Sequence, residues 1–321
     1  MCILHTLILV ICKCKNIGEK MKKNFKTSIG GQALIEGILM KGPQMTSVAV
    51  RKPDGEIEVK VKDESAKNNK LIFKIPFIRG ISKLVDSMSE GTKALYYSAS
   101  FYDDEEDKKE TSKFKDTLFN IFTFVFSFFI AIGLFVVIPT FIANFLKDKI
   151  NNIFLLNFVE GLIRISIFLI YITLISNQKD LKRVFMYHGA EHKTIFAYEN
   201  GLDLTVENVQ KMSKYHPRCG TSFLFMVMLV SIVVLSFFGW PSPVMRIVSR
   251  IIALPLVAAI SYEINRLIGK YDNVGFCRAV AKPGLWLQKI ATVKEPDDDM
   301  VEVAIAAVKE VIPSEEGLDA W

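Results

Sequence analysis

Cysteine and histidine are both scarce in this sequence, and the cysteines follow no regular spacing. Five cysteines are present: Cys2, Cys12, Cys14, Cys219 and Cys277. An irregular set does not indicate a disulfide framework, least of all in a chain whose polar segments we expect in the cytoplasm. A strong charge of one sign is absent as well, because a net charge of +6 and a pI near 8.9 are only mildly basic. The composition therefore indicates no nucleic acid as a partner.

Long apolar runs are the most informative feature. The hydrophobic share is 50% and the mean hydropathy is +0.29. Four segments approach or exceed the ~20 residues needed to cross a hydrocarbon core; they are 117–146, 153–176, 222–240 and 244–269. The last is the weakest, since Arg246 and Arg250 open it and Pro255 interrupts it. We predict an α-helical membrane protein with about four transmembrane helices and a small α+β cytoplasmic N-terminal region.

The distribution of Lys and Arg predicts the orientation. Most of these residues lie before the first apolar segment, in 177–221, and after the fourth segment. The positive-inside rule places those parts in the cytoplasm. We therefore expect a multi-pass protein of the cell membrane with both termini cytoplasmic. Membrane lipid is an expected partner, protein partners are not specified, and a homo-oligomer stays open because no small-residue dimer motif is evident.

The polar and apolar segments together divide the chain into five predicted regions. Residues 1–20 form a leader that lacks a basic start and a cleavage site, so it is either not native or a loose interfacial anchor, with Met21 as a second start. Residues 21–102 form the cytoplasmic α+β region and 103–116 a charged linker. The four-span membrane domain covers 117–269 and includes the cytoplasmic segment 177–221. Residues 270–321 form a cytoplasmic C-terminal segment.

Local patterns predict several elements in these regions. The Asp54-Gly55 turn predicts a hairpin over 45–62, with a further strand at 33–40. Apolar spacing predicts an amphipathic helix pair over 75–101. A helix is expected over 298–311, where acidic residues favour the N-terminus. The Gly30-Gly31 pair fits either simple turns or backbone amides that approach a phosphate.

The sequence "YHGAEHKTIFAYENG" (187–201) carries the chemistry-bearing residues. We expect a helix over 181–199, ended by Asn200-Gly201. His188 and His192 then share one face, one turn apart. Together with Glu191 they form the H-x-x-E-H order, in which two histidines bind zinc and the glutamate activates water.

Further ligands follow in "YHPRCGTS" (215–222), which supplies His216 and Cys219. We therefore predict zinc or another divalent metal at His188, His192, His216 and Cys219, structural if all four bind and open to water if three bind. Glu191 is the expected catalytic base.

Two alternatives to this ligand set stay open. Glu199 or Glu207 could replace Cys219 as a ligand. Arg218 with the amides of Gly220 and Thr221 could instead hold an anion or a lipid headgroup. A polar interfacial helix without any metal also fits the pattern.

Charges inside the apolar segments need partners. Glu160 and Arg164 are four residues apart and are expected to pair on one helix face. Glu263 and Arg266 are expected to behave similarly near the end of the fourth segment. Such charges indicate either function or helix pairing.

Several motifs in order resemble the YqhQ family of bacterial membrane proteins. They include "GGQALIEGILMKGP", "PFIRG", "YHGAEHKTIFAYENG", "HPRCGTSF", "PGLWLQKI" and "EPDDDMVEVAI". The resemblance spans roughly 28–307. It implies a domain of unknown function that carries the label of a predicted metal-dependent enzyme, a label that rests on the same His188, Glu191, His192 and His216 pattern and adds no independent evidence.

Three functions are compatible with these patterns. The first is a zinc-dependent hydrolase at the cytoplasmic membrane face, with Glu191 as the proton acceptor. The second is a non-enzymatic membrane assembly, transport or scaffold factor with a structural metal or a lipid-headgroup site. A transporter is weaker, because no repeat or broken-helix pair is evident. For the hydrolase we expect a cavity beside the histidines, partly lined by the segment around Gln32 and Glu36.

Overall fold

The computed structural model describes residues 25–65, 78–102, 113–239, 242–271, 274–315 and 317–320. The chain divides into two compact units, each made of separate stretches of sequence. We call Met1–Tyr102, Ile175–Met226 and Ala259–Trp321 the sheet unit, and Asp103–Leu174 with Val227–Ala258 the apolar unit. The predicted leader (1–20) and residues 103–112 of the predicted linker lie outside the described residues.

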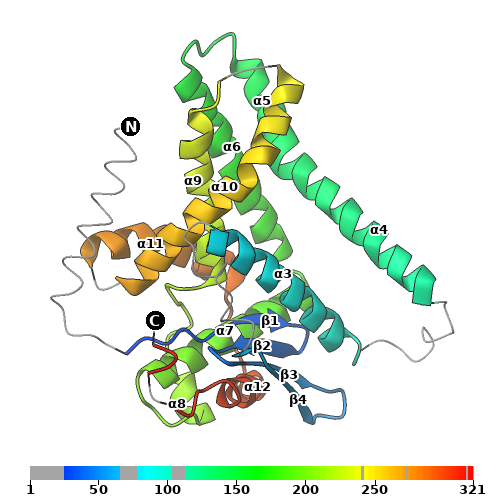
Figure 1. Cartoon of the computed structure of the whole chain (residues 1–321), viewed down its shortest axis with the longest axis vertical. Coiled ribbons are helices and arrows are strands. Elements are labelled where there is room, and N and C mark those ends of the chain that lie inside the picture. Colours follow the sequence, from blue (N-terminus) through cyan, green and yellow to red (C-terminus); the bar gives the residue numbers. More distant parts are fainter. Residues whose placement is uncertain are drawn as a thin grey trace. The chain divides into compact units, whose positions relative to one another are not determined.

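A four-stranded antiparallel sheet in the order β1-β2-β3-β4 forms the centre of the sheet unit (Figure 1). The strands are β1 Gly30–Leu34, β2 Gly37–Lys41, β3 Met45–Arg51 and β4 Ile57–Asp63. The predicted hairpin is confirmed, because β3 pairs with β4 from Met45↔Asp63 to Arg51↔Ile57. Gly55 has φ +91°, a value that glycine adopts without the steric penalty of a Cβ.

The single strand predicted at 33–40 is wrong, since the chain turns back on itself within that range. β1 pairs with β2 from Gly30↔Lys41 to Leu34↔Gly37, and the two residues between them make the turn. Glu36 adopts φ +49° there, and its carbonyl accepts a hydrogen bond from the Arg51 amide at 2.8 Å. Neither loop residue, Ile35 or Glu36, is a glycine, asparagine or proline, so turn chemistry did not reveal the turn.

Helices cover both faces of the sheet. Alternate residues of β2 point to opposite sides. Ile38 and Met40 join a core with α7 Lys179–Glu199 and α12 Asp298–Lys309, whereas Leu39 packs with Ala94 of α3 Ile78–Ala99. The fully buried side chains of α12, such as Val303 and Val308, each stabilise this core by roughly 1.5–3 kcal/mol. The C-terminal helix thus completes the core of the N-terminal sheet.

The helix pair predicted over 75–101 is, in its described part, one helix of 22 residues, α3. Its small residues Gly91 and Ala94 face the sheet, where a Cβ on Gly91 would collide with Gln32. Large apolar residues of α3, such as Val85 and Met88, are exposed. The predicted amphipathic character is confirmed, but the described residues form one continuous helix instead of two.

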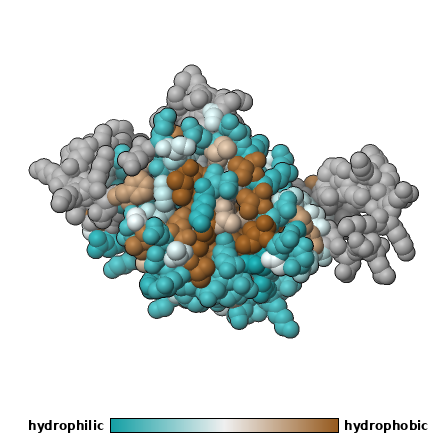
Figure 2. Space-filling view, turned by 90° about the horizontal axis from the view of Figure 1, so that it is seen from below, coloured by the Kyte–Doolittle hydropathy of each residue, from teal (hydrophilic) through white to brown (hydrophobic). Residues whose placement is uncertain are grey.

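The other helices of the sheet unit lie around this core. The predicted helix 181–199 is confirmed as α7, followed by Asn200 and by Gly201 at φ +66°. The predicted C-terminal helix is confirmed as α12, capped by Asp297, whose carboxylate accepts from the Met300 amide at 3.0 Å. The remaining elements are α8 Val206–Gln210, α11 Gly275–Leu287 and the π-helical turn η4 Gln288–Thr292. Seen from the end where α8 and α12 lie in Figure 1, the surface is mostly hydrophilic, with apolar residues gathered near its centre (Figure 2).

The apolar unit consists of long helices with exposed apolar side chains. Phe129, Phe141 and Phe145 are each more than 60% exposed, as expected of residues that face lipid. The elements with residues in this unit are α4 Lys113–Ile132, η3 Gly133–Val137, α5 Ile138–Leu146, α6 Ile153–Ile175, α9 Gly220–Ser236 and α10 Pro243–Lys270. α9 and α10 each continue into the sheet unit.

Three helical stretches of the described chain are long and apolar enough to cross a membrane: Val125–Leu146, Ile153–Ile175 and Val244–Lys270. They suggest membrane association. The prediction of about four spans is therefore supported in part: three of the four segments form candidate spans, and the segment 222–240 forms the shorter apolar helix α9, of 17 residues. At 1.5 Å per residue it reaches about 26 Å, short of a ~30 Å hydrocarbon core. The segment with the weakest sequence signal forms the longest helix, α10, with Pro255 inside it.

Candidate metal centre

One face of α7 carries His188, Glu191 and His192, as their spacing predicts. The two imidazole ring centroids are 4.4 Å apart. Cys219, directly before α9, brings its Sγ to 3.0 Å from His188 Nε2. In the described part of the chain, these two histidines and Cys219 form a group whose ligand atoms all lie within 4.8 Å of one another. The structure thus joins three of the four predicted ligands.

Backbone carbonyls fix the orientation of both imidazole rings. His188 Nδ1 lies 2.8 Å from the carbonyl oxygen of Thr292, and His192 Nδ1 lies 2.6 Å from that of Lys214. A carbonyl oxygen only accepts, so each Nδ1 carries a proton and donates it. In the neutral ring each Nε2 then offers its lone pair, which is how metal-binding histidines are usually held. His192 Nε2 is buried without a hydrogen-bond partner among the described residues.

Cys219 lies at the N-terminus of α9, which favours its thiolate. The Thr221 amide donates to its Sγ at 3.3 Å. Burial would raise the pKa of Cys219, but the charges of His188 and His192 lower it well below its usual value. Burial would lower the pKa of His188, but the charge of Cys219 raises it to about 10. Without a metal, the two residues form a thiolate–imidazolium pair.

Glu191 is buried beside this group and is held by β1. Its Oε1 accepts a hydrogen bond from the Gly31 amide at 2.9 Å. Its Oε2 is buried and has no hydrogen-bond partner among the described residues. Burial raises the pKa of Glu191. A Cβ on Gly31 would come within 2.6 Å of the Leu39 carbonyl oxygen and 3.2 Å of Glu191 Cδ, so the close approach requires glycine.

His216 lies next to the group without turning its nitrogens toward it. Its ring centroid is 5.6 Å from that of His192. Its Nδ1 accepts from the Arg218 amide at 3.3 Å, and its Nε2 lies 3.7 Å from Glu199. Burial lowers the pKa of His216 to about 4, so the ring is neutral at pH 7. As a fourth ligand, His216 would need a different ring orientation.

The alternative ligands and the anion-binding residues are engaged elsewhere. Glu199 forms an ion pair with Arg218, and its Oε1 also accepts from the Thr27 amide at 2.8 Å. Glu207 is exposed and pairs with Lys211 at 2.6 Å. Of the three residues predicted to hold an anion, Arg218 pairs with Glu199 and the Thr221 amide donates to Cys219 Sγ. These contacts do not involve Gly220.

Gln288 holds the segment that delivers Cys219, and sequence reasoning did not single it out. The side chain is fully buried. Its Oε1 accepts from the His216 amide at 3.0 Å, and its Nε2 donates to the His216 carbonyl at 2.8 Å and to Ser222 Oγ at 3.1 Å. The only available signal was a polar residue within the apolar stretch "GLWLQKI".

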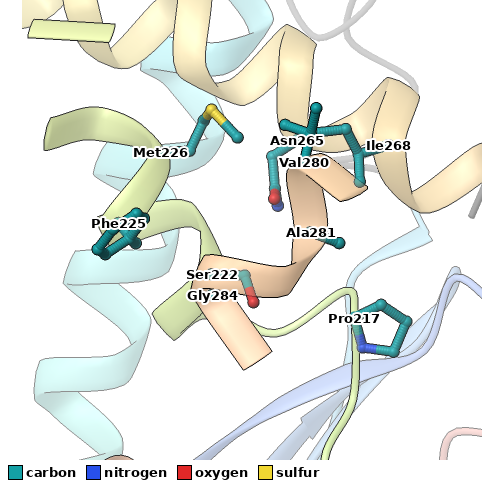
Figure 3. A pocket seen from close by; sticks show the side chains of 9 residues that line it. All are labelled: Pro217, Ser222, Phe225, Met226, Asn265, Ile268, Val280, Ala281 and Gly284. Atoms are coloured by element: carbon teal, nitrogen blue, oxygen red, sulfur yellow. The ribbon is translucent and has the colours of Figure 1, made fainter. Parts of the chain in front are cut away.

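We expected the segment around Gln32 and Glu36 to line a cavity beside the histidines; the segment does lie along α7, but the cavity in Figure 3 includes neither residue. Glu36 forms an ion pair with Arg183 and accepts from the Tyr187 hydroxyl at 3.2 Å. Figure 3 shows a cavity that is lined by Pro217 and by residues of α9, α10 and α11. The centre of a water molecule can occupy about 10 Å³ of this cavity, which is enough room for about one water. Its lining includes Pro217, Ser222 and Gly284 but none of the histidines.

A second acidic group lies between the sheet and α3. Glu64, Asp86 and Glu90 have carboxylate oxygens within the same 4.8 Å limit. The Lys41 ammonium lies 3.3, 2.9 and 2.5 Å from them, respectively. Burial opposes the charge of Lys41, but Glu90 and Asp86 raise its pKa above the usual value. The Lys41 ammonium therefore lies among the three carboxylates and, together with Lys62 at 2.6 Å from Glu64, offsets part of their charge, so cations of the chain itself already lie where a metal would be held.

Comparisons with known proteins agree with the motifs. The chain is 34% identical over 308 residues to the uncharacterized protein YqhQ of Bacillus subtilis (strain 168), covering 91% of this chain and 94% of that protein. No solved structure matches. The model of the family described as "Protein of unknown function (DUF1385)" matches residues 75–314. The chain therefore belongs to this YqhQ-like family of proteins of unknown function.

Proposed function

We propose that this protein is a metal-dependent hydrolase that acts at a membrane surface. Zinc or another divalent ion would be held by His188, His192 and Cys219, with Glu191 as the base. The supporting observation is the orientation of the two imidazoles, whose Nδ1 atoms face the carbonyls of Thr292 and Lys214 and whose Nε2 atoms are turned to the same small space.

Two neutral nitrogens and a thiolate are a donor set that zinc prefers. Catalytic zinc sites use three protein ligands and keep one position for water, and a bound zinc lowers the pKa of that water to about 7. Three ligand atoms converge among the described residues, which matches this pattern.

Glu191 has the properties of a proton acceptor for such a water. The Gly31 amide fixes one carboxylate oxygen, and the other has no partner in the described part of the chain. Burial raises the pKa of the carboxyl, which makes it a stronger base than an exposed glutamate. The Lys and Arg distribution supports a location of this chemistry at the cytoplasmic face.

Metal content tests the site. The full chain is purified in detergent without chelator, and zinc is measured beside the His188→Ala/His192→Ala double variant. We expect about one zinc per chain in the wild type, by the donor set above, and almost none in the variant. Gln210→Ala, outside the metal-ligating group, serves as the control and should keep its metal. A wild-type protein without metal would exclude the proposal.

Glu191→Gln tests the hydrolase. The variant should retain zinc, because Glu191 is not among the grouped ligands. Its hydrolysis of 4-nitrophenyl acetate, used as a probe of activated water, should fall about 100-fold or more, the usual effect of losing a general base. Equal rates for the variant and the wild type would contradict the role of Glu191.

A structural metal is the second candidate, and the burial of the site favours it. His192, Glu191 and Cys219 are each no more than 5% exposed, and the site joins α7 to β1 and to the start of α9. Replacing zinc by Co²⁺ and adding azide distinguishes the two functions. An open position changes the cobalt absorption bands, whereas a closed structural site leaves them unchanged.

A further inference from the structure

The helix α11 turns its small residues inward. Cys277, Ala281 and Gly284 are buried and follow one another at intervals of four and three residues, so they share one face. A Cβ on Gly284 would come within 2.6 Å of Ser222 Oγ, near the start of α9. Figure 3 shows Gly284 directly beside Ser222. The protein itself therefore already covers this face of α11.

The large apolar residues of α11 lie on another face, which is exposed. Phe276 and Trp286 are 54% and 49% exposed. Ala279 and Pro283 lie between them at intervals of three and four residues, so the four residues form one row along the helix. A helix that buries its small residues and exposes an aromatic residue near each end is suited to an apolar partner.

Basic residues lie beside this apolar row. Arg278 and Lys282 are four residues apart on α11, which puts them on one face, and both are exposed. The sequence has no aspartate or glutamate from 274 to 294, so no acidic residue of α11 offsets their charge. An apolar row next to a basic row is typical of a helix that lies in the interface of an anionic membrane.

The end of α10 leads α11 to the headgroup level of a membrane. The candidate span Val244–Lys270 has 27 residues. It rises about 40 Å, roughly 10 Å more than a ~30 Å hydrocarbon core needs. Arg266 and Lys270, in its last two turns, are exposed, so this end of the helix suits the headgroups. Because α11 begins at Gly275, soon after the span ends, it starts at that level when α10 crosses the membrane.

We infer that α11 lies in the membrane interface and binds anionic lipid headgroups through Arg278 and Lys282. Phe276 and Trp286 insert at the boundary between headgroups and acyl chains, a depth at which tryptophan is enriched. The two basic side chains extend from the same helix toward the phosphate oxygens, with which they form charge-assisted hydrogen bonds. This surface shares no residue with the metal centre, and the inference does not depend on the proposed hydrolase activity.

The fluorescence of Trp286 tests the contact with lipid. The chain has three tryptophans, so replacing Trp240 and Trp321 by phenylalanine leaves Trp286 as the reporter. The full chain is placed in nanodiscs whose phosphatidylcholine carries bromine on the acyl chains near the headgroup. We expect the bromine to quench Trp286 and iodide in the water to leave it almost unquenched. Quenching by iodide alone would overturn the inference. Quenching by neither agent would overturn it as well, because a protein surface such as a second copy of this chain then covers the helix.

The preference for anionic lipid is measured by moving the bromine from one lipid to another. All discs contain phosphatidylcholine with equal minority shares of phosphatidylglycerol and of a second phosphatidylcholine, and one minority lipid is brominated. A lysine or arginine near an anionic surface strengthens binding about five-fold, so brominated phosphatidylglycerol should quench Trp286 about two-fold or more strongly than the brominated neutral lipid. Salt at about 1 M should remove the difference, because it shortens the screening length to ~3 Å. Equal quenching by the two lipids at low salt would overturn the inference.

The double variant Arg278→Gln/Lys282→Gln, made in the same single-tryptophan chain, assigns the preference to these two residues. It should lose the difference between the two brominated lipids, while brominated phosphatidylcholine should still quench Trp286, because the apolar row is intact. Lys309→Gln is the matched control, since Lys309 is an exposed lysine at the end of α12, and it should keep the full difference.

A double variant that prefers phosphatidylglycerol as strongly as its parent would contradict the role of Arg278 and Lys282. A Lys309→Gln protein that loses the preference would contradict it too, because the effect would then follow the net charge of the chain and not this helix. If the double variant does not fold, the comparison of the two brominated lipids at low and high salt still decides.

Discussion

Replacing Gln288 by leucine should destabilise the sheet unit and weaken metal binding together. The two side chains have similar volumes, so the change removes hydrogen bonds and leaves the packing nearly intact. Gln288 satisfies both the amide and the carbonyl of His216 in a fully buried position. The segment that carries Cys219 to the histidines depends on these contacts.

The size of the effect follows from the groups that lose their partners. Each buried backbone group without a partner costs about 1–3 kcal/mol, and two such groups remain at His216. The Ser222 hydroxyl can rotate, and the leucine regains part of the loss through its apolar surface. We expect a net loss of about 2–4 kcal/mol, which lowers the unfolding midpoint by roughly 5–10 °C. Zinc affinity should fall about 10- to 100-fold, as for other groups that orient metal ligands.

Differential scanning fluorimetry gives the midpoint, and competition with a chelator gives the zinc affinity. Lys289→Gln is the matched control, since Lys289 is the exposed neighbour in sequence and its change should stay within about 0.5 kcal/mol. If Gln288→Leu unfolds at the midpoint of the control and binds zinc equally well, Gln288 does not hold the Cys219 segment, and the reasoning fails.

Three further predictions concern the sheet unit. Gly31→Ala should destabilise the protein by about 1–3 kcal/mol through overpacking and lower its zinc-dependent hydrolysis. Gly30→Ala is the control, because a Cβ added at Gly30 meets no atom within 4 Å, and it should change neither quantity in the same fluorimetric and rate assays. Lys41→Met should destabilise the protein at pH 7. Because the fold raises the pKa of Lys41, the stability difference from the wild type should persist below pH about 10.5 and disappear as the pH rises further. A pH series of urea unfolding measures this difference. Asp297→Ala should remove the cap on the Met300 amide and cost about 1 kcal/mol in the same urea assay; an unchanged midpoint would show that the cap is dispensable.

Local sequence signals predicted the elements whose geometry is decided within a few residues. Asp54-Gly55 located one hairpin, and Asn200-Gly201 located the end of α7. The turn between β1 and β2 escaped because Glu36 takes a left-handed conformation that its type rarely adopts. Its hydrogen bond with Arg51, which lies on β3, is a tertiary contact and leaves no local trace.

The same distinction between local and tertiary features applies to the metal centre. Helical spacing placed His188, Glu191 and His192 on one face of α7, whereas the carbonyls that orient the two imidazoles belong to Lys214 and Thr292. A backbone carbonyl has no sequence signature, so these partners could not be predicted. The Gly30-Gly31 pair fitted either simple turns or amides that approach a phosphate, and in the fold the Gly31 amide donates to a carboxylate of the protein itself, that of Glu191.

The charges within the apolar helices show where such reasoning stops. Glu160 and Arg164 pair at 3.0 Å, as their spacing of four residues predicts. Glu263, expected to behave like them with Arg266, pairs with Arg79 of α3, which lies 184 residues earlier in the chain. Spacing within a helix reveals a partner on the same helix, because helix geometry alone fixes that distance. A partner on another helix depends on which faces pack together, and for buried charges that packing is what decides whether the charge is balanced.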